Sequence, residues 1–137
     1  MDYKLEKFKK FSDIRGDLIV FLKNGELPKK RREFGQIYFV TFDGKDVVRG
    51  SHYHKKWTEW FGIVAGKLEV TLEDVNTKER MTFIFDSSED KYARLVIGPQ
   101  IAHSFRSLSK YAALLNYADS EWSDKDTFHY DFEKLSL

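Results

Sequence analysis

The sequence RGSHYH at residues 49–54 is the most informative stretch of the chain, and the fold prediction starts from it. Alternate side chains of a β-strand share one face, so His52 and His54 are predicted to point the same way. Five residues later Glu59 begins a second predicted strand, residues 59–65, which ends at Gly66. The stretch therefore predicts neighbouring strands that carry two imidazoles and a carboxylate.

A third histidine is also expected at the start of a strand. His103 follows Gly98 and Pro99, and it begins a predicted strand over residues 103–105. Three of the four histidines are thus expected at strand starts, where they would form one pocket. The fourth, His129, lies in the carboxy-terminal tail and is expected to be an ordinary surface residue.

Apolar residues alternate with polar ones through most of the chain, which is typical of half-buried strands. Two further segments, residues 37–42 and 111–117, are apolar on both faces and are expected between layers or at a subunit contact. About ten short strands without a long helical pattern predict an antiparallel sandwich or barrel. The tail, residues 124–137, predicts either a short helix or a last strand. The alternating segments are residues 18–22, 67–73, 81–85 and 93–97.

Length and composition narrow the class of protein. The chain has 137 residues, so we expect one domain over residues 1–137. Its 23 basic and 22 acidic residues give a net charge of +1, which argues against a nucleic-acid partner. It has no apolar run near the roughly 20 residues that a membrane span needs, and no cysteine. We therefore expect no membrane partner and a cytoplasmic location.

The motifs resemble those of the cupin superfamily. His52, His54, Glu59 and Gly66 are spaced as in the first cupin motif, and GPQIAH at residues 98–103 is similar to the second. The resemblance implies an all-β, single-domain antiparallel jelly-roll barrel. It also implies a ligand pocket inside one open end of that barrel.

Within the superfamily the chain most resembles the sugar-nucleotide 3,4-ketoisomerases of the WxcM-like type. It is more distantly similar to the dTDP-4-keto-6-deoxyhexose 3,5-epimerases. DIRGDL at residues 13–18 is similar to an amino-terminal element of both groups. RGSHYHK at residues 49–55 is similar to the ketoisomerase sequence, since epimerases usually carry Gln where His54 stands. Two departures are Glu59, where ketoisomerases tend to have Gln, and Ser107, which replaces the closing Asn of the second motif.

The resemblance implies an isomerase that acts on a nucleoside-diphosphate 4-keto-6-deoxy sugar in deoxysugar or surface-polysaccharide biosynthesis. A proton leaves C3, an enediol forms, and a proton returns at C4. Histidine suits both steps because its ordinary pKa is about 6.5. We predict that His52 is the base at C3 and that His54 donates the proton toward C4. The reaction needs no cofactor because it moves protons without net oxidation.

Other residues are expected to bind the substrate. Arg15 and Arg49 resemble the arginines that hold the pyrophosphate in related cupins, and a guanidinium matches phosphate oxygens in pairs. Tyr38 resembles a pocket tyrosine of the family. Residues expected in the pocket beside these are Glu59, His103 and Tyr117, and those that could stack on a base or sugar ring are Trp57, Trp60 and Trp122.

Two other functions remain open at the level of sequence. His52, His54, Glu59 and His103 together would suit a divalent transition metal, as in a dioxygenase-like cupin. A non-catalytic domain that binds a nucleotide sugar is the other. Within the isomerase prediction itself, the sequence does not exclude epimerase activity at C3 or C5. The cationic run at residues 29–32 is expected to be a solvated loop.

We also predict the oligomeric state. Strand edges and segments that are apolar on both faces suggest a homodimer. The resemblance implies a homodimer as well, often with exchange of amino-terminal strands between the two chains.

Overall fold

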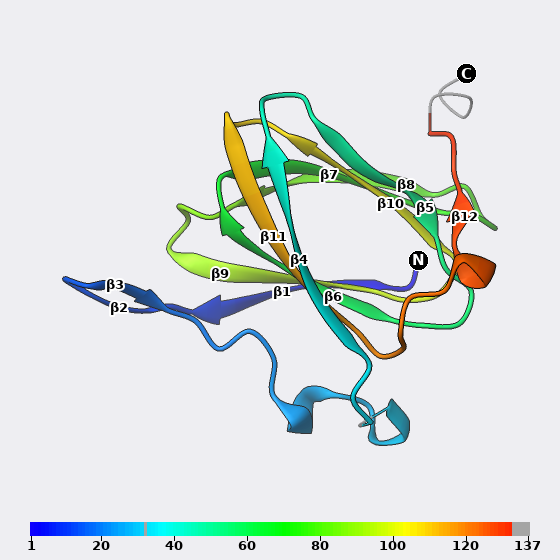
Figure 1. Cartoon of the computed structure of the whole chain (residues 1–137), viewed down its shortest axis with the longest axis horizontal. Helices are drawn as coiled ribbons and strands as arrows, with labels where there is room; N and C mark the ends of the chain where they lie inside the picture. The colour runs from blue at the N-terminus through cyan, green and yellow to red at the C-terminus, as the bar shows by residue number, and fades with distance from the viewer. Residues whose placement is uncertain (32, 133–137) are drawn as a thin grey trace.

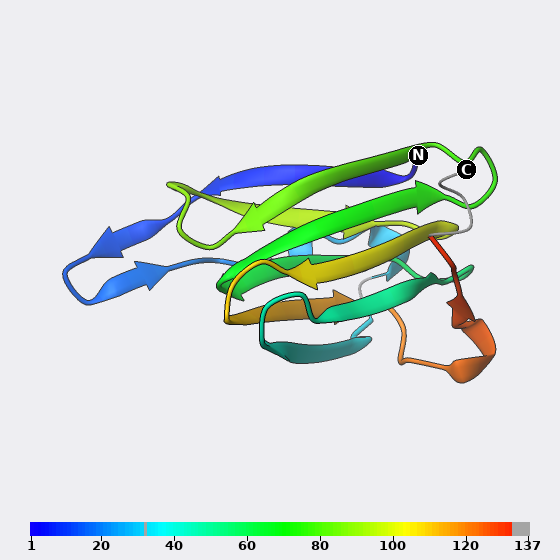
Figure 2. The same ribbon diagram turned by 90° about the horizontal axis from the view of Figure 1, so that it is seen from above.

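The computed structural model describes residues 1–31 and 33–132, and two five-stranded antiparallel sheets face each other in it (Figures 1 and 2). Apart from one hairpin, residues 67–86, strands that are neighbours within a sheet are not consecutive along the chain. The first sheet, in spatial order, contains β1 (Tyr3–Lys9), β9 (Lys91–Ile97), β6 (Glu59–Ala65), β11 (Tyr111–Ala118) and β4 (Gln36–Asp43). The second contains β12 (Phe128–His129), β5 (Val48–Tyr53), β10 (Ile101–Ser107), β7 (Lys67–Asp74) and β8 (Arg80–Asp86). This arrangement confirms the predicted all-β jelly roll.

The space between the sheets changes from apolar to polar along the strands. Along β11, Leu114 packs in the hydrophobic core while Asn116, two residues on, is a buried amide. The same change occurs along β6, where the buried carboxylate of Glu59 lies on the polar side of Phe61. Side chains two residues apart share a face, so one interior contains both ends of this gradient. The apolar end is the core, and the polar end is available for chemistry.

Smaller elements lie outside the two sheets. A hairpin of β2 (Phe11–Asp13) and β3 (Gly16–Leu18) extends away from the body, on the side opposite η3 and β12 (Figure 1). The 3-10 turns are η1 (Asn24–Glu26), η2 (Lys29–Arg31) and η3 (Asp124–Asp126).

A buried cation holds the segment after the hairpin against the first sheet. Arg94 of β9 is 2% exposed, and its guanidinium lies 3.1 Å from Glu6 and 2.9 Å from Glu26. It also donates to the Phe21 carbonyl. A buried charge is tolerated only when paired in this way, so Arg94 ties β1, β9 and η1 together.

Several predictions on secondary structure need correction. A strand over residues 18–22 is wrong, because only Leu18 belongs to a strand and residues 19–23 are irregular. Leu18 and Val20 are exposed, while Phe21 and Leu22 pack in a small separate cluster, so the alternation marks no sheet face.

The prediction that His52 and His54 lie at a strand start is also wrong. His52 lies near the end of β5, and His54 lies just beyond it. The tail contains both a 3-10 turn and a two-residue strand, and residues 133–137 lie outside the described part, as does Arg32 of the cationic run. Among the described residues no helix is long and apolar enough to cross a membrane.

Candidate active site

The register between β5 and β10 brings two histidines face to face. His52 pairs with His103, and the next pair is Gly50 with Ser104, so Ser51 is an extra, bulged residue. The bulge uses positive φ angles of 92° at Gly50 and 59° at Ser51. A Cβ atom on Gly50 would lie 2.8 Å from the His103 carbonyl oxygen, which explains why glycine precedes the histidine pair.

The three histidine rings form one cluster. The ring centroid of His52 lies 5.0 Å from that of His54 and 4.8 Å from that of His103. His54 and His103 are buried, whereas His52 is partly accessible. The prediction that the His52 and His54 side chains share a face is confirmed by this geometry.

Glu59 lies beneath the rings at the polar end of β6. One carboxylate oxygen, Oε1, is 3.1 Å from His54 Nε2 and 3.5 Å from His103 Nε2, although neither contact is a well-aligned hydrogen bond. The other oxygen accepts a hydrogen bond of 3.0 Å from the Asn116 amide. Glu59 is 4% exposed, so its negative charge is felt mainly by the two imidazoles.

Burial and charge act in opposite directions on the histidines. Burial, helped by His103 and His54, lowers the pKa of His52 to about 4, so this ring is neutral near pH 7. Burial also lowers the pKa of His103. Burial alone would lower the pKa of His54 too, but the Glu59 carboxylate outweighs it and raises that pKa. Burial would raise the pKa of Glu59, but the neighbouring histidines, His54 first, hold that pKa below its ordinary value.

Two hollows meet at His52. One is lined by His52, His103 and Arg49 over apolar core residues, and the other by His52, His54 and Glu59. Tyr38 of β4 lines both hollows, and burial of its phenol, together with the nearby Glu59 charge, raises the pKa of Tyr38.

Arginine and tryptophan side chains border these hollows. Arg49 is exposed, and its Nε donates to the Thr41 carbonyl at 3.0 Å. The Trp57 ring lies 4.2 Å from the His54 ring at 30°, while Trp122 is 56% exposed at the side of the second hollow. Positive charge and flat apolar surface thus surround the histidines.

Three residues with predicted roles lie elsewhere. Arg15 lies in the turn of the β2–β3 hairpin, where its exposed guanidinium pairs with Asp13 at 2.5 Å. Tyr117 is buried against Trp60, and its hydroxyl oxygen accepts from the Gly35 N–H. The structure therefore does not bring Arg15, Tyr117 or Trp60 to the histidine pocket of their own chain. His129 is exposed, as predicted.

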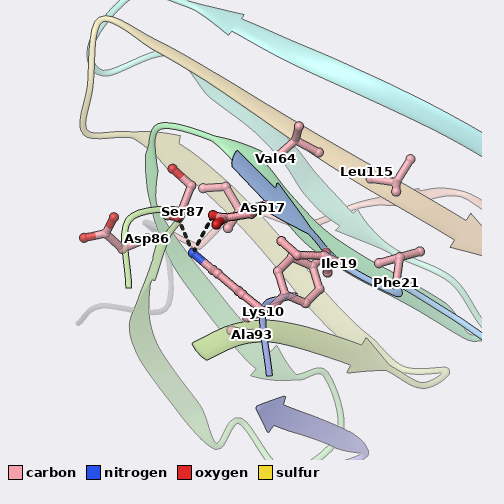
Figure 3. A pocket seen from close by; sticks show the side chains of 11 residues that line it. Lys10, Asp17, Ile19, Phe21, Val64, Asp86, Ser87, Ala93 and Leu115 are labelled. Carbon is pink, nitrogen blue, oxygen red and sulfur yellow. Dashed lines mark hydrogen bonds and ion pairs between the residues drawn. The ribbon is translucent and has the colours of Figure 1, made fainter. Parts of the chain in front are cut away.

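A separate pocket lies at the root of the hairpin (Figure 3). Lys10 lies at its centre, donates a hydrogen bond of 2.7 Å to the Ser87 carbonyl and lies 3.8 Å from Asp17. Its other walls are mainly apolar and include Phe21, Val64 and Leu115. None of the three clustered histidines lines this pocket.

Two functional neighbours of the histidines are missing from the sequence-based prediction. Asn116 holds Glu59, and it could have been noticed as an amide within an apolar strand. Asp126 accepts a hydrogen bond from His54 through its backbone carbonyl. A backbone contact from the tail leaves no trace in residue type, so no sequence signal pointed to it.

The cluster can move protons or hold a metal. A neutral imidazole beside an imidazole that is paired with a carboxylate supplies a base and an acid in one pocket. Ring nitrogens of His52, His54 and His103 also lie within 4.8 Å of one another, which is the donor set of a transition-metal site. Both chemistries fit the residues present.

Fold and site together define the class: a cupin-like jelly roll with a histidine–carboxylate pocket. The family model described as FdtA, WxcM-like, C-terminal, matches residues 1–135. The chain belongs to this family.

Named relatives resemble the chain over nearly its whole length. A TDP-4-oxo-6-deoxy-alpha-D-glucose-3,4-oxoisomerase of Aneurinibacillus thermoaerophilus is 27% identical over 127 residues, which are 92% of this chain and 85% of the relative. A 3,4-ketoisomerase from Helicobacter canadensis is 27% identical with a TM-score of 0.79, covering 98% of this chain and 95% of that one. The sugar 3,4-ketoisomerase QdtA from Thermoanaerobacterium thermosaccharolyticum, solved with TDP, is 22% identical with a TM-score of 0.78, covering 98% and 91%.

Proposed function

We propose that the protein is an isomerase that moves the carbonyl of a nucleoside-diphosphate 4-keto-6-deoxy sugar from C4 to C3. The observation that carries this proposal is a pair of unlike imidazoles, His52 and His54, 5.0 Å apart and lining one hollow. The named relatives are 3,4-ketoisomerases, and one of them is an oxoisomerase of TDP-4-oxo-6-deoxyglucose. We take that sugar nucleotide as the first substrate to test.

The two imidazoles are suited to opposite steps. His52 has a pKa lowered to about 4, so its neutral ring accepts the proton that leaves C3. The electrons of the broken C–H bond form the C3–C4 double bond of an enediol, and the C4 oxygen takes a proton. His54, whose pKa Glu59 raises, then returns a proton to C4 as the C3 hydroxyl becomes the ketone. The C–H bond lost at C3 is balanced by the one gained at C4, and the proton taken by the C4 oxygen is balanced by the one lost from the C3 hydroxyl. His52 then gives its proton to solvent and His54 takes one up, which restores both imidazoles.

Two polar side chains support this assignment. Tyr38 lines both hollows and keeps its hydroxyl proton because burial raises its pKa, so it donates to a sugar oxygen. Arg49 has an exposed guanidinium in the wall of the first hollow, and we assign it to the pyrophosphate.

We further propose a homodimer in which the β2–β3 hairpin of one protomer reaches its partner. Phe11 and Ile14 of the hairpin are 55% and 103% exposed, and Ile37 and Phe39 on the edge strand β4 are 57% and 73% exposed. A second copy would cover these apolar residues. It would also explain Arg15, which we assign to the pyrophosphate in the partner's pocket.

A single substitution tests the base. The variant His52→Asn is expected to lose about 10²-fold or more in turnover with nearly unchanged affinity for the nucleotide. Turnover is followed by NMR as deuterium from solvent enters C3 and C4 of the sugar, and affinity for TDP by calorimetry. The matched control is His129→Asn, because His129 pairs with His52 across the strands but is exposed.

The outcomes separate the candidate functions. If wild-type protein catalyses no exchange in any dTDP- or GDP-4-keto-6-deoxyhexose, the isomerase proposal fails. If it then still binds the nucleotide sugar, the protein is a binding domain. Exchange at C5, or an inverted C3 centre, would indicate an epimerase instead.

Mixing two inactive variants tests the hairpin proposal. Protein with Arg15→Ala is combined with protein carrying His52→Asn, under conditions in which subunits exchange. If Arg15 acts across the dimer, half the dimers regain one of two sites, about one quarter of wild-type turnover. Full activity of Arg15→Ala alone, or no gain on mixing, would rule out this role.

A metal-assisted reaction is the second candidate, favoured by the three ring nitrogens within 4.8 Å and by Glu59 Oε1, which is buried without a hydrogen bond beside two of them. Protein purified without chelators is analysed for transition metals. Near one equivalent per chain would favour this candidate, and less than about a tenth would count against it.

The proposed substrate also bears on location. A nucleoside diphosphate is highly charged and does not cross a bilayer unaided. We therefore include in the proposal the cytoplasmic location expected from the sequence.

A further inference from the structure

One residue of the tail contacts three consecutive residues of the candidate site. The backbone carbonyl of Asp126 lies 2.7 Å from His54 Nδ1. Its carboxylate accepts one hydrogen bond from the Lys55 N–H and another from the Lys56 N–H, each of 3.0 Å. Asp126 is 5% exposed, so water does not compete for these bonds. The residue thereby clamps the backbone that follows His54.

The carbonyl contact decides which ring nitrogen of His54 carries hydrogen. A carbonyl oxygen only accepts, so Nδ1 must be the N–H that donates to it. The other ring nitrogen, Nε2, faces Glu59 at 3.1 Å. In this orientation Nε2, the atom that faces Glu59, is the one at which a proton is gained or lost. In the opposite tautomer, the lone pair of His54 Nδ1 would face a lone pair of the Asp126 carbonyl oxygen, and the hydrogen bond would be lost.

The rest of the tail keeps that carbonyl in place. Phe128 stacks on Tyr53 with ring centroids 5.3 Å apart, and the Tyr130 N–H donates to the Ser51 carbonyl at 2.8 Å. These contacts fix the tail to β5 on the carboxyl side of Asp126, while its carboxylate fixes the turn itself. Loss of the carboxylate would leave the His54 contact held only by its neighbours along the chain.

We propose that Asp126 is a positioning residue of the isomerase: it sets the tautomer and orientation of His54 so that Nε2 serves the pocket. This role rests on the proposed function, in which His54 returns the proton to C4. Asp126 does not reach the reacting atoms itself and acts only through His54.

The first test needs no substrate. Long-range ¹H–¹⁵N spectra of the full chain report which nitrogen of His54 is protonated. In wild-type protein Nδ1 is expected to be protonated, whereas Asp126→Ala should show exchange between tautomers. The control is Asp124→Ala, an exposed acid of the same 3-10 turn, which should leave the spectrum unchanged. An unprotonated Nδ1 in wild type, or an unaltered His54 signal in Asp126→Ala, would overturn the proposal.

The second test uses turnover. Asp126→Ala should lower kcat about 10-fold or more with KM within about 2-fold, because positioning of an acid matters mainly at the transition state. In the background His54→Gln, which keeps a polar group near Nε2 but has no ring nitrogen facing Asp126, the same change should cost little. Equal losses in both backgrounds would indicate a purely structural role and overturn the proposal.

Folding is checked in parallel. Should Asp126→Ala not fold, Asp126→Asn keeps the side-chain volume and one acceptor oxygen, and it is expected to show a smaller loss of kcat in the same direction. The wild-type tautomer is measurable in either case. Absence of turnover in wild-type protein would refute the isomerase proposal, while the spectra would still decide what Asp126 does to His54.

Discussion

A carboxylate at position 59 adds a proton-holding group to the histidine cluster. Burial would lower the pKa of all three histidines, and the Glu59 charge outweighs burial only at His54, whose pKa is raised while those of His52 and His103 stay lowered. Without that charge, burial would lower the pKa of His54 as well. In the proposed mechanism, Glu59 therefore makes His54 the acid, while burial keeps His52 neutral as the base.

Replacing Glu59 by glutamine tests this reasoning. The variant Glu59→Gln keeps the size of the side chain but removes its charge, so the pKa of His54 should fall. In the pH profile of kcat/KM, the alkaline limb should move to lower pH by about one unit or more. A limb that stays in place would show that another group sets the protonation of His54.

The wild-type pH profile follows from the same residues. The base form of His52 is present above its lowered pKa of about 4 and is lost as the pH falls through that value. The acid form of His54 is present below its raised pKa and is lost as the pH rises past it. We expect a bell with its acid limb well below pH 6.5 and its alkaline limb above 6.5. An acid limb at the ordinary histidine pKa would contradict the assignment of His52 as the base.

The alternation of side chains between the two faces of a strand explains which site residues the sequence could predict. His52, His54, Glu59 and His103 lie on strands, or directly after one, whose period is clear, so their common face could be read. Residues 111–117 are apolar on both faces, so the sequence did not show whether position 116 or 117 faces inward. In the structure Asn116 faces Glu59 and Tyr117 packs outward against Trp60.

At the scale of elements, most strands of the two main sheets were predictable, whereas β1 and the amino-terminal connections were not. Strands such as β7 and β8 bury one face, which leaves a period of two in the sequence. The β2–β3 hairpin has no second layer in this chain, and its residues are exposed on both faces. Without burial there is no periodic signal, so the hairpin was not predicted, and the apolar alternation over residues 18–22 was wrongly interpreted as a strand.

The turn between β6 and β7 gives a prediction about stability. Gly66 has φ +77°, and a Cβ atom there would lie 2.1 Å from the Tyr111 carbonyl oxygen. Gly66→Ala should therefore lower the free energy of unfolding by about 2 kcal/mol or more, measured by urea denaturation. Gly25→Ala is the control, since a Cβ there meets nothing within 4 Å. Equal stability of the two variants would mean that the turn relaxes easily.

At the scale of the whole molecule, the outward face of β4 carries the prediction on assembly. Phe39 is 73% exposed, so Phe39→Lys costs the single chain little packing but places a charge in the proposed interface. Light scattering after gel filtration should show a dimer for wild type and a monomer for the variant. The control is Lys45→Ala, at an exposed position beyond the end of β4. A wild-type monomer, or a variant that still dimerises equally well, would contradict the proposed interface.

The interior gradient between the sheets has a consequence for how such proteins diversify. Residues that keep the chain folded, such as Leu68 and Leu95, belong to the hydrophobic core, and other residues, which we propose contact the substrate, line the second hollow. Substitutions at Tyr38 or Trp122 thus alter recognition without emptying the region that supplies most of the folding free energy. We expect a library randomised at these wall positions to contain many folded proteins with new sugar preferences. In evolutionary terms, the residues that keep this fold stable and the residues that can change to accept a new sugar are different residues.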